Sequence, residues 1–254
     1  MRICRFLQDD EISFGLIEGD GIVVLDGHPF GGLTPAGRVV GLSEVRLTAP
    51  VLPSKIIAVG RNYVDHAKEF GNQVPAEPMI FLKPSTSIVG PGEPIALPWQ
   101  TEHVDHEAEL AVVIGRLVRD VPEERAEEVI LGYTIANDVS ARDLQKADGQ
   151  WGRAKGFDTF CPLGPWIETD LDTESARITC TVNGHLRQDA STGDLVFDVP
   201  RLVSFISSVM TLLPGDVILT GTPAGVGPIV AGDSVTVAIA GIGALLPGIS
   251  GAIG

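Results

Sequence analysis

Apolar residues along this chain fall mostly into short blocks with the alternation or β-branched content of strands. Gly, Pro and Asn separate the blocks, and the Asn183-Gly184 pair predicts a tight hairpin turn. Strands outnumber helices and do not alternate regularly with them, so the pattern favours a mainly β fold with α elements over a doubly wound parallel fold. The predicted strands lie in "MRICRFL", "SFGLIEG", "GIVVLDG", "KIIAVG", "HEAELAVVIG", "YTIANDVS", "ITCTVNGHLRQD", "DVILTGTPAGVG" and "DSVTVAIAG".

Three segments carry helical signals instead. "NYVDHAKEFG" offers Asn62 as a cap and Gly71 as a terminator. "PEERAEEVILG" (122–132) has Pro122 where the first helical turn tolerates it. "DVPRLVSFISSVMTLLPGD" offers Asp198 as a cap. The apolar stripe predicted for this last helix comprises Leu202, Phe205, Ile206, Val209 and Leu213.

A join rich in proline, between Pro50 and Pro53, is the candidate domain boundary. It separates a small N-terminal β domain, residues 1–52, from a main domain, residues 53–254. The chain of 254 residues is long enough to bury a sizeable core in this arrangement.

Charge and cysteine content exclude several classes of function. A formal net charge of −15 disfavours nucleic acid and anionic lipid as partners. The three cysteines include no C-x-x-C pair, so neither a disulfide framework nor a cysteine-zinc site is indicated. The N-terminus carries acids where a signal peptide needs an apolar core, and no apolar run reaches the ~18 residues of a spanning helix. We therefore expect a cytoplasmic protein that does not cross a membrane.

Two glutamates, Glu107 and Glu109, stand at the entrance of an apolar block. On a strand, residues two apart share a face, so their carboxylates would lie side by side. Adjacent carboxylates in a partly dry site repel, so either one keeps its proton or a cation lies between them. Oxygen ligands suit Mg²⁺, and Asp138, at the end of the next predicted strand, offers a third. The strand would place Glu107, Glu109, Ala111 and Val113 on one face and Ala108, Leu110, Val112 and Ile114 on the other.

Other interpretations of these acids remain open at this point. The two glutamates also fit the solvated face of an amphipathic edge strand. His103 and His106 suggest zinc, but His106 has the opposite parity from the glutamates and should point away. Asp105 with the glutamates superficially matches a glycosidase carboxylate set, although an aromatic content of 6% is low for a sugar platform.

A set of motifs resembles a known family. "GRNYVDHAKE", "FLKPSTSIVGPGEPI", "HEAELAVVIG", "ANDVSARDLQ", "KGFDTFCPLGPW", "VNGHLRQD" and "LTGTPAGVGP" occur in this order. Together, from about residue 53 to 240, they are similar to the fumarylacetoacetate hydrolase family in its short prokaryotic-type branch, which includes acylpyruvate hydrolases and 2-hydroxyhepta-2,4-diene-1,7-dioate isomerases. The first 50 residues fit the small leading domain of that branch more loosely. The resemblance implies a mixed β-roll or sandwich with flanking short helices, usually as a homodimer.

The resemblance also implies a Mg²⁺ or Mn²⁺ site made by Glu107, Glu109 and Asp138. The substrates it implies are small 2,4-diketo acids, other 2-oxo acids or 2-hydroxy-dienoic acids, which undergo C–C cleavage, decarboxylation or isomerisation. A 2-oxo acid chelates a metal through its carboxylate and keto oxygen, and the metal stabilises the enolate formed when the adjacent bond breaks. All three reactions share this requirement, so the metal site alone does not choose among them.

Further residues acquire roles through the resemblance. His66 and Glu69 are three apart and share a helix face; the resemblance makes them a dyad in which the histidine takes a proton from water and the glutamate orients it. Without the resemblance they would be a solvated helix face. Lys155 would stand beside the substrate as a catalytic cation. Arg142, Gln145 and Thr222 would be substrate contacts.

Three residues are assigned less active roles. Lys83 is expected either at the mouth of the site or in a structural turn, and Asp143 is expected either to support the site from outside the ligand set or to form an ion pair, but not to be a ligand. Larger family members supply a fourth carboxylate from the segment that matches "GRNYVDH". This chain has no clear equivalent, so Asp65 is not expected to be a ligand and water would fill that position.

The primary hypothesis is a metal-dependent hydrolase that cleaves a C–C bond in acylpyruvate-type 2,4-diketo acids, because His66 and Glu69 favour hydrolysis. The alternative on the same site is a decarboxylase or isomerase of 2-hydroxy-dienedioates or oxaloacetate. A third hypothesis is a metal-binding β protein without catalysis. The sequence does not specify the acyl group or the choice between Mg²⁺ and Mn²⁺.

Overall fold

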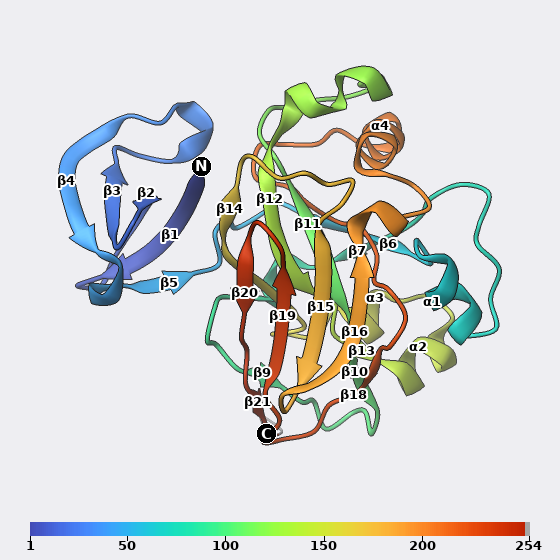
Figure 1. Cartoon of the computed structure of the whole chain (residues 1–254). Helices are drawn as coiled ribbons and strands as arrows, with labels where there is room; N and C mark the ends of the chain where they lie inside the picture. The colour runs from blue at the N-terminus through green and yellow to red at the C-terminus, as the bar shows by residue number, and fades with distance from the viewer. Residues whose placement is uncertain (252–254) are drawn as a thin grey trace.

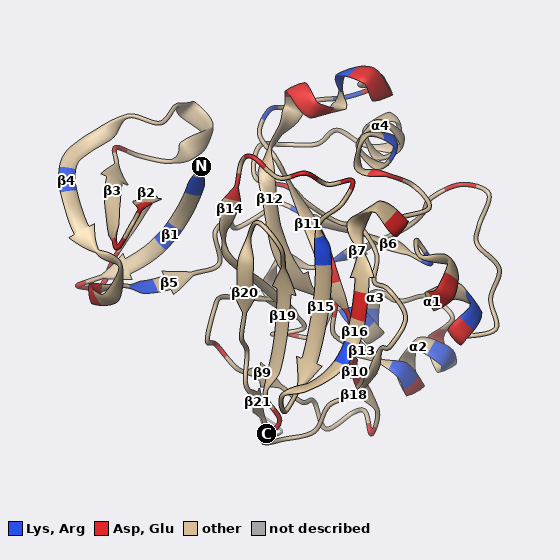
Figure 2. Cartoon of the chain, in the orientation of Figure 1, with Lys and Arg blue, Asp and Glu red and all other residues tan. Residues whose placement is uncertain are grey.

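Strands dominate the computed structural model, which describes residues 1–251 (Figure 1). Short helices lie at the periphery of mixed sheets, so the predicted mainly β class is confirmed. Acidic positions are spread over both parts of the chain, whereas basic positions are few and scattered (Figure 2). Among the described residues, none of the helices combines the length and apolar character needed to cross a membrane.

The first strands form an antiparallel meander at one end of the large sheet (Figure 1). They enclose a small core of Cys4, Phe6, Ile22 and Val24. Strand β4 (Pro35–Gly41) begins inside a Gly- and Pro-rich stretch, residues 27–37, for which the sequence predicts no strand. The strands are β1 (Arg2–Gln8), β2 (Glu11–Glu18), β3 (Gly21–Leu25), β4 (Pro35–Gly41) and β5 (Arg46–Thr48).

Among the described residues, a 12-stranded sheet has the central order β4-β3-β2-β1-β14-β12-β11-β17-β6-β7. Its central strand β11 is buried on both faces: Leu110 and Val112 belong to one hydrophobic core, and Ala111 and Val113 to another. The predicted strand parity is therefore correct. The other strands of this sheet are β6 (Ile56–Gly60), β7 (Met79–Lys83), β8 (Ile88–Val89), β11 (Ala108–Ile114), β12 (Ile130–Asn137), β14 (Cys161–Glu168) and β17 (Val217–Leu219).

A second antiparallel sheet, in the order β16-β15-β19-β20, covers β11 and β12 (Figure 1). Residues of both sheets, such as Leu110 and Ile178, share one core. The hairpin turn is confirmed: Asn183 and Gly184 have φ of 53° and 76°, as a turn of primed type requires. The strands are β15 (Arg177–Val182), β16 (His185–Ser191), β19 (Val235–Ile239) and β20 (Gly243–Leu245).

Short strands close the structure around these sheets. Strand β10 lies between β13 and β18, and it delivers the chain to the start of β11. In the apolar C-terminal tail, β21 pairs with β9 in parallel, whereas residues 252–254 lie outside the described part. These strands are β9 (Ile95–Ala96), β10 (Val104–His106), β13 (Ser140–Ala141), β18 (Gly227–Pro228) and β21 (Ile249–Ser250).

Two of the predicted helices differ from the prediction in type or length. The segment 122–132 is a 3-10 helix over Glu123–Val129 and then enters β12, because its β-branched end joins the sheet. The longest helix is capped by Asp198 as predicted, but it stops at Val209. The α-helices are α1 (Val64–Glu69), α2 (Arg142–Asp148), α3 (Gly152–Lys155) and α4 (Val199–Val209); the 3-10 helices are η1 (Pro29–Gly31), η2 (Leu42–Glu44), η3 (Ser85–Ser87), η4 (Glu123–Val129) and η5 (Thr192–Asp194).

The apolar stripe predicted on α4 is correct only in its first half. Leu202 and Ile206 are fully buried, whereas Val209 is 52% exposed. Leu213 lies beyond the helix, because the chain becomes extended at Met210 and Leu212 bridges to Val118.

Candidate active site

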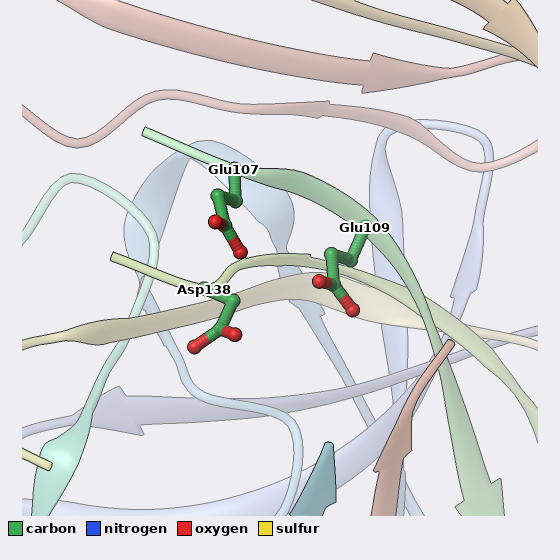
Figure 3. A group of neighbouring side chains, drawn as sticks. All are labelled: Glu107, Glu109 and Asp138. Carbon is green, nitrogen blue, oxygen red and sulfur yellow. The ribbon is translucent and has the colours of Figure 1, made fainter. Parts of the chain in front are cut away.

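Three carboxylates meet where β11 begins and β12 ends (Figure 3). Glu107 lies between β10 and β11; its amide donates to the side chain of Asn137, and its carbonyl accepts from the amide of Asp138. One carboxylate oxygen each from Glu107, Glu109 and Asp138 lies within 4.8 Å of the others. Their exposures of 3%, 1% and 1% exclude the solvated edge strand. The sequence predicted this meeting.

Lys155, at the end of α3, holds two of these carboxylates together. Its Nζ donates to Glu107 Oε2 at 2.7 Å, Asp138 Oδ2 at 2.6 Å and Ser140 Oγ at 2.7 Å. Burial lowers the Lys155 pKa, but Asp138 and Glu107 outweigh it and the net shift is upward. The group is therefore an ammonium whose three N–H donors are all occupied by the protein.

Lys83 is placed differently from either expectation. It ends β7, is 2% exposed, and pairs with Asp138 Oδ1 while donating to the Phe160 carbonyl at 3.1 Å. It lies neither at the mouth of the site nor in a turn. Strands β17 and β6 separate β7 from β11 in the sheet, yet Lys83 reaches Asp138, which therefore has a lysine on each of its oxygens.

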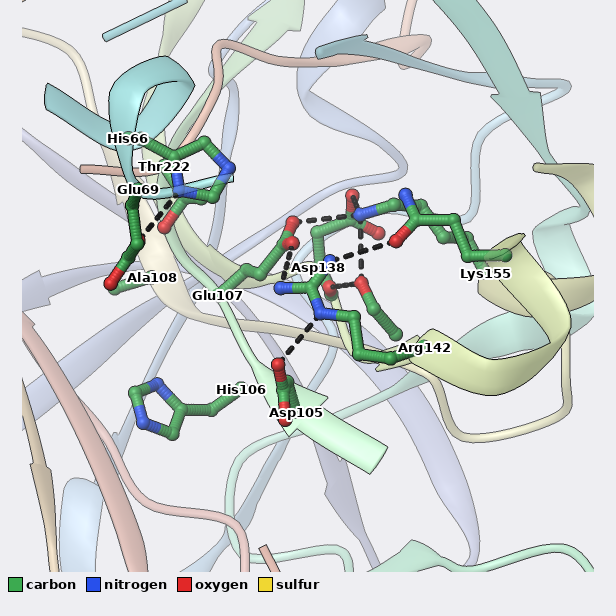
Figure 4. Close-up of polar contacts among 12 residues, drawn as sticks. His66, Glu69, Asp105, His106, Glu107, Ala108, Asp138, Arg142, Lys155 and Thr222 are labelled. Atoms are coloured by element: carbon green, nitrogen blue, oxygen red, sulfur yellow. Dashed lines mark hydrogen bonds and ion pairs between the residues drawn. The ribbon is translucent and has the colours of Figure 1, made fainter. Parts of the chain in front are cut away.

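Arg142, at the start of α2, bridges the outer side of the cluster (Figure 4). Its guanidinium contacts Asp105 and Glu107, each at 2.7 Å, and donates to Gln145 Oε1 at 3.0 Å. Its charge also lies 4.9 Å from the ring centroid of Phe70. Burial lowers the pKa of Arg142, but Glu107 and Asp105 raise it by more. The net shift is upward, so the guanidinium stays charged.

The remaining acids and histidines of this region lie outside the cluster. His106 points away from it, as parity predicted, and His103 pairs with Asp105 at 3.1 Å. Asp143 is exposed, lies outside the carboxylate cluster, and accepts from Thr101 and the amide of Glu102; it forms no ion pair among the described residues. Asp65 is exposed on α1 and pairs with Lys68.

Glu109 differs from its neighbours because it has no basic partner among the described residues. Its Oε2 accepts from the amide of Gly221 at 2.7 Å. Burial, Asp138 and Glu107 raise its pKa well above the ordinary value. Burial also raises the Glu107 pKa, but Lys155 and Arg142 reverse the shift to well below the ordinary range. In the metal-free protein, Glu109 is therefore the carboxyl that keeps a proton.

The cluster fits a hard divalent cation. Oxygen donors from three carboxylates are the ligands that Mg²⁺ and Mn²⁺ prefer. Glu109 is buried and faces the other two acids without a counter-ion. This arrangement is what a site for a positively charged ion would show.

His66 and Glu69 form a hydrogen-bonded pair on α1. His66 Nδ1 lies 3.2 Å from Glu69 Oε2, and Glu69 Oε1 accepts from the amide of Gly225 at 3.1 Å. The bond to a carboxylate places the proton on Nδ1, so Nε2 keeps a lone pair. Burial lowers the His66 pKa and keeps the ring neutral. Asn62 does not cap this helix: its side chain bonds the Phe197 backbone and the Thr220 carbonyl instead.

A cavity of about 420 Å³ opens beside the carboxylates. All the site residues that the sequence predicts line it, except Glu69, which supports His66 from behind. The wall also contains residues to which the sequence assigned no role, among them two cationic and two aromatic side chains: Arg61, Lys146, Phe81 and Trp151. Gly60 leaves room for Trp151, since a Cβ there would lie 2.5 Å from the indole ring. Two of these lie in quoted motifs: Arg61, which has a φ of 58°, in "GRNYVDHAKE", and Phe81 at the start of "FLKPSTSIVGPGEPI".

The loop after β17 supports both the dyad and the cavity. Gly225 has a φ of 97°, and a Cβ there would lie 2.0 Å from the Arg187 carbonyl oxygen. Gly225→Ala should therefore lift the loop from β16, free Glu69 and cost roughly 1–3 kcal/mol of stability. Gly232→Ala is the matched control, because its φ of 93° is similar but its surroundings are open. Thermal unfolding and turnover of both variants test this; equal effects would contradict it.

Comparison with known proteins identifies the family. The model described as "Fumarylacetoacetate (FAA) hydrolase C-terminal" matches residues 55–249, and "Rv2993c-like, N-terminal" matches residues 1–50. The chain belongs to the fumarylacetoacetate hydrolase family. It is thus an enzyme of that family, and the resemblance seen in the motifs is confirmed.

Two curated relatives match most of this chain. Protein Rv2993c of Mycobacterium tuberculosis is 52% identical over 255 residues, covering 96% of each chain. The mitochondrial oxaloacetate decarboxylase of Dictyostelium discoideum is 45% identical over 195 residues, covering 74% of this chain and 89% of that protein.

Solved structures of this family share the fold over nearly the whole chain. The 5-carboxymethyl-2-hydroxymuconate delta-isomerase of Mycobacterium smegmatis is 54% identical, with a TM-score of 0.94, covering 99% of this chain and 100% of that one. The maleylpyruvate hydrolase of Sphingobium sp. SYK-6, in complex with manganese(II) and pyruvate, is 34% identical, with a TM-score of 0.82 and full coverage of both chains.

Proposed function

We propose that this enzyme uses Mg²⁺ or Mn²⁺ to isomerise or decarboxylate small 2-oxo diacids of the oxaloacetate or 2-hydroxy-dienedioate type. The buried cluster of Glu107, Glu109 and Asp138, open to a cavity of about 420 Å³, carries the proposal. A divalent cation bound there supplies Lewis-acid stabilisation of the negative charge that develops on a 2-oxo acid when a bond to C3 breaks.

The cavity wall supports a substrate with a second carboxylate. Arg61 and Lys146 line it and form no ion pair among the described residues. They are therefore available to an anion, unlike Lys155, whose donors are occupied. The names of relatives also support isomerisation or decarboxylation. The decarboxylase and the delta-isomerase, at 45% and 54% identity, are more similar to this chain than the maleylpyruvate hydrolase at 34%.

His66 is the proposed base. His66 lines the cavity, its Nε2 carries a free lone pair, and Glu69 holds the ring through Nδ1. Accepting a proton from C3 would interconvert keto and enol forms. The same atom would deprotonate a water, which favours C–C hydrolysis of acylpyruvates as the second candidate function. His66 and Glu69 alone do not separate the two reactions.

A substrate panel tests the proposal. Oxaloacetate, 2-hydroxyhepta-2,4-dienedioate and two acylpyruvates are assayed with Mg²⁺, with Mn²⁺ and with EDTA, using wild type and Glu107→Gln. We expect turnover of the diacids that EDTA and Glu107→Gln both remove. Unchanged turnover in EDTA would contradict the metal mechanism. Faster cleavage of acylpyruvates would select the hydrolase, and Mg²⁺ stabilisation without any turnover would support a non-catalytic protein.

His66→Ala should lower turnover by about 10²–10⁴-fold, the usual contribution of a general base, and leave Mn²⁺ affinity unchanged. Because burial lowers the His66 pKa, wild-type activity measured at saturating Mn²⁺ should fall only as pH falls through that lowered pKa. This acid limb should be missing in the residual activity of the variant. His185→Ala, at an exposed position, is the control. A parallel loss of Mn²⁺ affinity would count against the role of base.

A further inference from the structure

Gln188, on β16, is a fully buried polar side chain that touches the site only indirectly. Its Oε1 accepts from the amide of Ala108 at 3.0 Å and lies 3.1 Å from His106 Nδ1. Its Nε2 donates to Thr222 Oγ1 at 2.7 Å and to the Pro223 carbonyl at 2.8 Å. Both acceptor and both donor positions of the amide are therefore used.

Two of these partners fix which way the amide faces. A backbone N–H can only donate, so the atom facing Ala108 is the oxygen. A backbone carbonyl can only accept, so the atom facing Pro223 is the nitrogen. A flipped amide would lose both bonds and bring like groups together. The direction of the bond to Thr222 follows: Gln188 donates and the Thr222 hydroxyl oxygen accepts.

The hydroxyl hydrogen of Thr222 is thereby directed elsewhere. Among the described residues, the Thr222 hydroxyl donates to no protein acceptor, and the residue lines the cavity beside the carboxylates. The hydrogen is therefore available to an acceptor that enters the cavity, such as an anionic or carbonyl oxygen of a bound ligand.

His106 keeps Gln188 in this orientation. Since Gln188 Oε1 is an acceptor, His106 carries its proton on Nδ1, and its Nε2 is buried without a partner. The histidine lies on the opposite side of the strand from Glu107 (Figure 4). It thus has a part in the support of the site, although it cannot be a metal ligand.

We propose that Gln188 is a positioning residue: it sets Thr222 as a hydrogen-bond donor to a carboxylate or enolate oxygen of the substrate. The amide also joins Ala108, between the two glutamates, to the loop whose Gly221 amide donates to Glu109. One side chain therefore fixes the distance between the acid cluster and the donor of the loop. The inference rests on the proposed function insofar as an oxo acid must bind in this cavity.

Oxalate, a stable dianion shaped like the enolate of a 2-oxo acid, is the probe, and the protein is the full chain loaded with Mn²⁺. Gln188→Glu replaces the N–H donors with acceptors, so the Thr222 hydroxyl should turn to donate into the interior. Oxalate affinity should fall about tenfold, as for one lost hydrogen bond to a charged group, while Mn²⁺ affinity should change less than about twofold, because Gln188 contacts none of the three carboxylates. Gln100→Glu, at an exposed position, is the control.

The pair of residues gives the decisive comparison. Thr222→Val should lose about the same factor as Gln188→Glu, Thr222→Ser should retain oxalate affinity, and the double variant should lose no more than either single one. The proposal would be overturned if the double variant lost oxalate affinity by the product of the two single factors, or if Thr222→Val kept the wild-type affinity. If Gln188→Glu does not fold, Gln188→Met replaces it, with thermal unfolding measured throughout.

Failure of the proposed function would look different. Wild-type protein that binds Mn²⁺ but no oxalate would refute the oxo-acid site and this inference together. Wild-type protein that binds oxalate, with no dependence on Gln188 or on the Thr222 hydroxyl, would refute this inference alone.

Discussion

Glu109→Gln should lower turnover by at least about 100-fold, since a catalytic metal contributes several kcal/mol, and should remove the thermal stabilisation given by Mn²⁺. The metal-free protein should nevertheless be close to wild type in stability. Glutamine resembles the protonated carboxyl that the raised pKa predicts, and its side-chain oxygen can still accept from the Gly221 amide. Glu102→Gln, on the exposed approach to β10, is the control.

The same side chain makes metal affinity depend on pH. A cation must displace the proton of Glu109, so below that raised pKa the affinity for Mn²⁺ should increase about tenfold per pH unit, and level off above it. Glu102→Gln, which keeps Glu109, should show the same slope as wild type. Titrations of Mn²⁺ at several pH values measure it, and calorimetry in two buffers counts the released proton. A wild-type affinity independent of pH would contradict the assignment of the proton to Glu109.

Lys83→Met should destabilise the metal-free protein by about 3–5 kcal/mol, the usual cost of removing one partner from a buried ion pair. Asp138 would keep Lys155 but lose the contact on its other oxygen. Since one positive charge leaves the cluster, Mn²⁺ should raise the melting temperature of the variant more than that of wild type. Thermal unfolding with and without Mn²⁺ measures both effects.

Lys68→Met is the matched control, because Lys68 pairs with Asp65 on the exposed face of α1. Its stability should change by less than about 1 kcal/mol. Equal destabilisation of the two variants would show that Lys83 contributes through its aliphatic chain and not through its charge. A smaller Mn²⁺ effect in Lys83→Met than in wild type would mean that Lys83 orients Asp138 for the metal.

The acid cluster could be predicted from the sequence because a strand has a period of two. That rule places Glu107 and Glu109 on one face wherever the strand lies. Asp138 follows the adjacent strand, and the antiparallel pairing of β11 with β12 sets Ala108 opposite Asn137. The local pattern therefore sufficed for the glutamate pair, residues 115–129 bring the chain back so that Asp138 lies beside it, and the family motifs added the roles.

The supporting residues could not be predicted because they depend on pairing between distant segments. Lys83 reaches Asp138 only because β6 and β7 join the sheet beyond β17. Gln188 lies opposite Ala108 only because a second sheet covers the first. Nothing in the local pattern around either residue distinguishes it from a solvated polar position. The 3-10 segment before β12 was misread for a related reason, since its charged residues resemble those of an ordinary helix start.

Strand β11, buried on both faces between β12 and β17, has a mechanical consequence for the enzyme. Elements with this much packing open only when the whole domain opens, whereas exposed short helices fray at little cost. The carboxylates therefore stand beside the strand that we expect to open last. His66 and Arg142 stand on the short helices α1 and α2, which we expect to open more readily. The charge that receives the substrate is set before the substrate arrives. The short helices that contact the rest of the substrate can change in sequence without disturbing the central sheet.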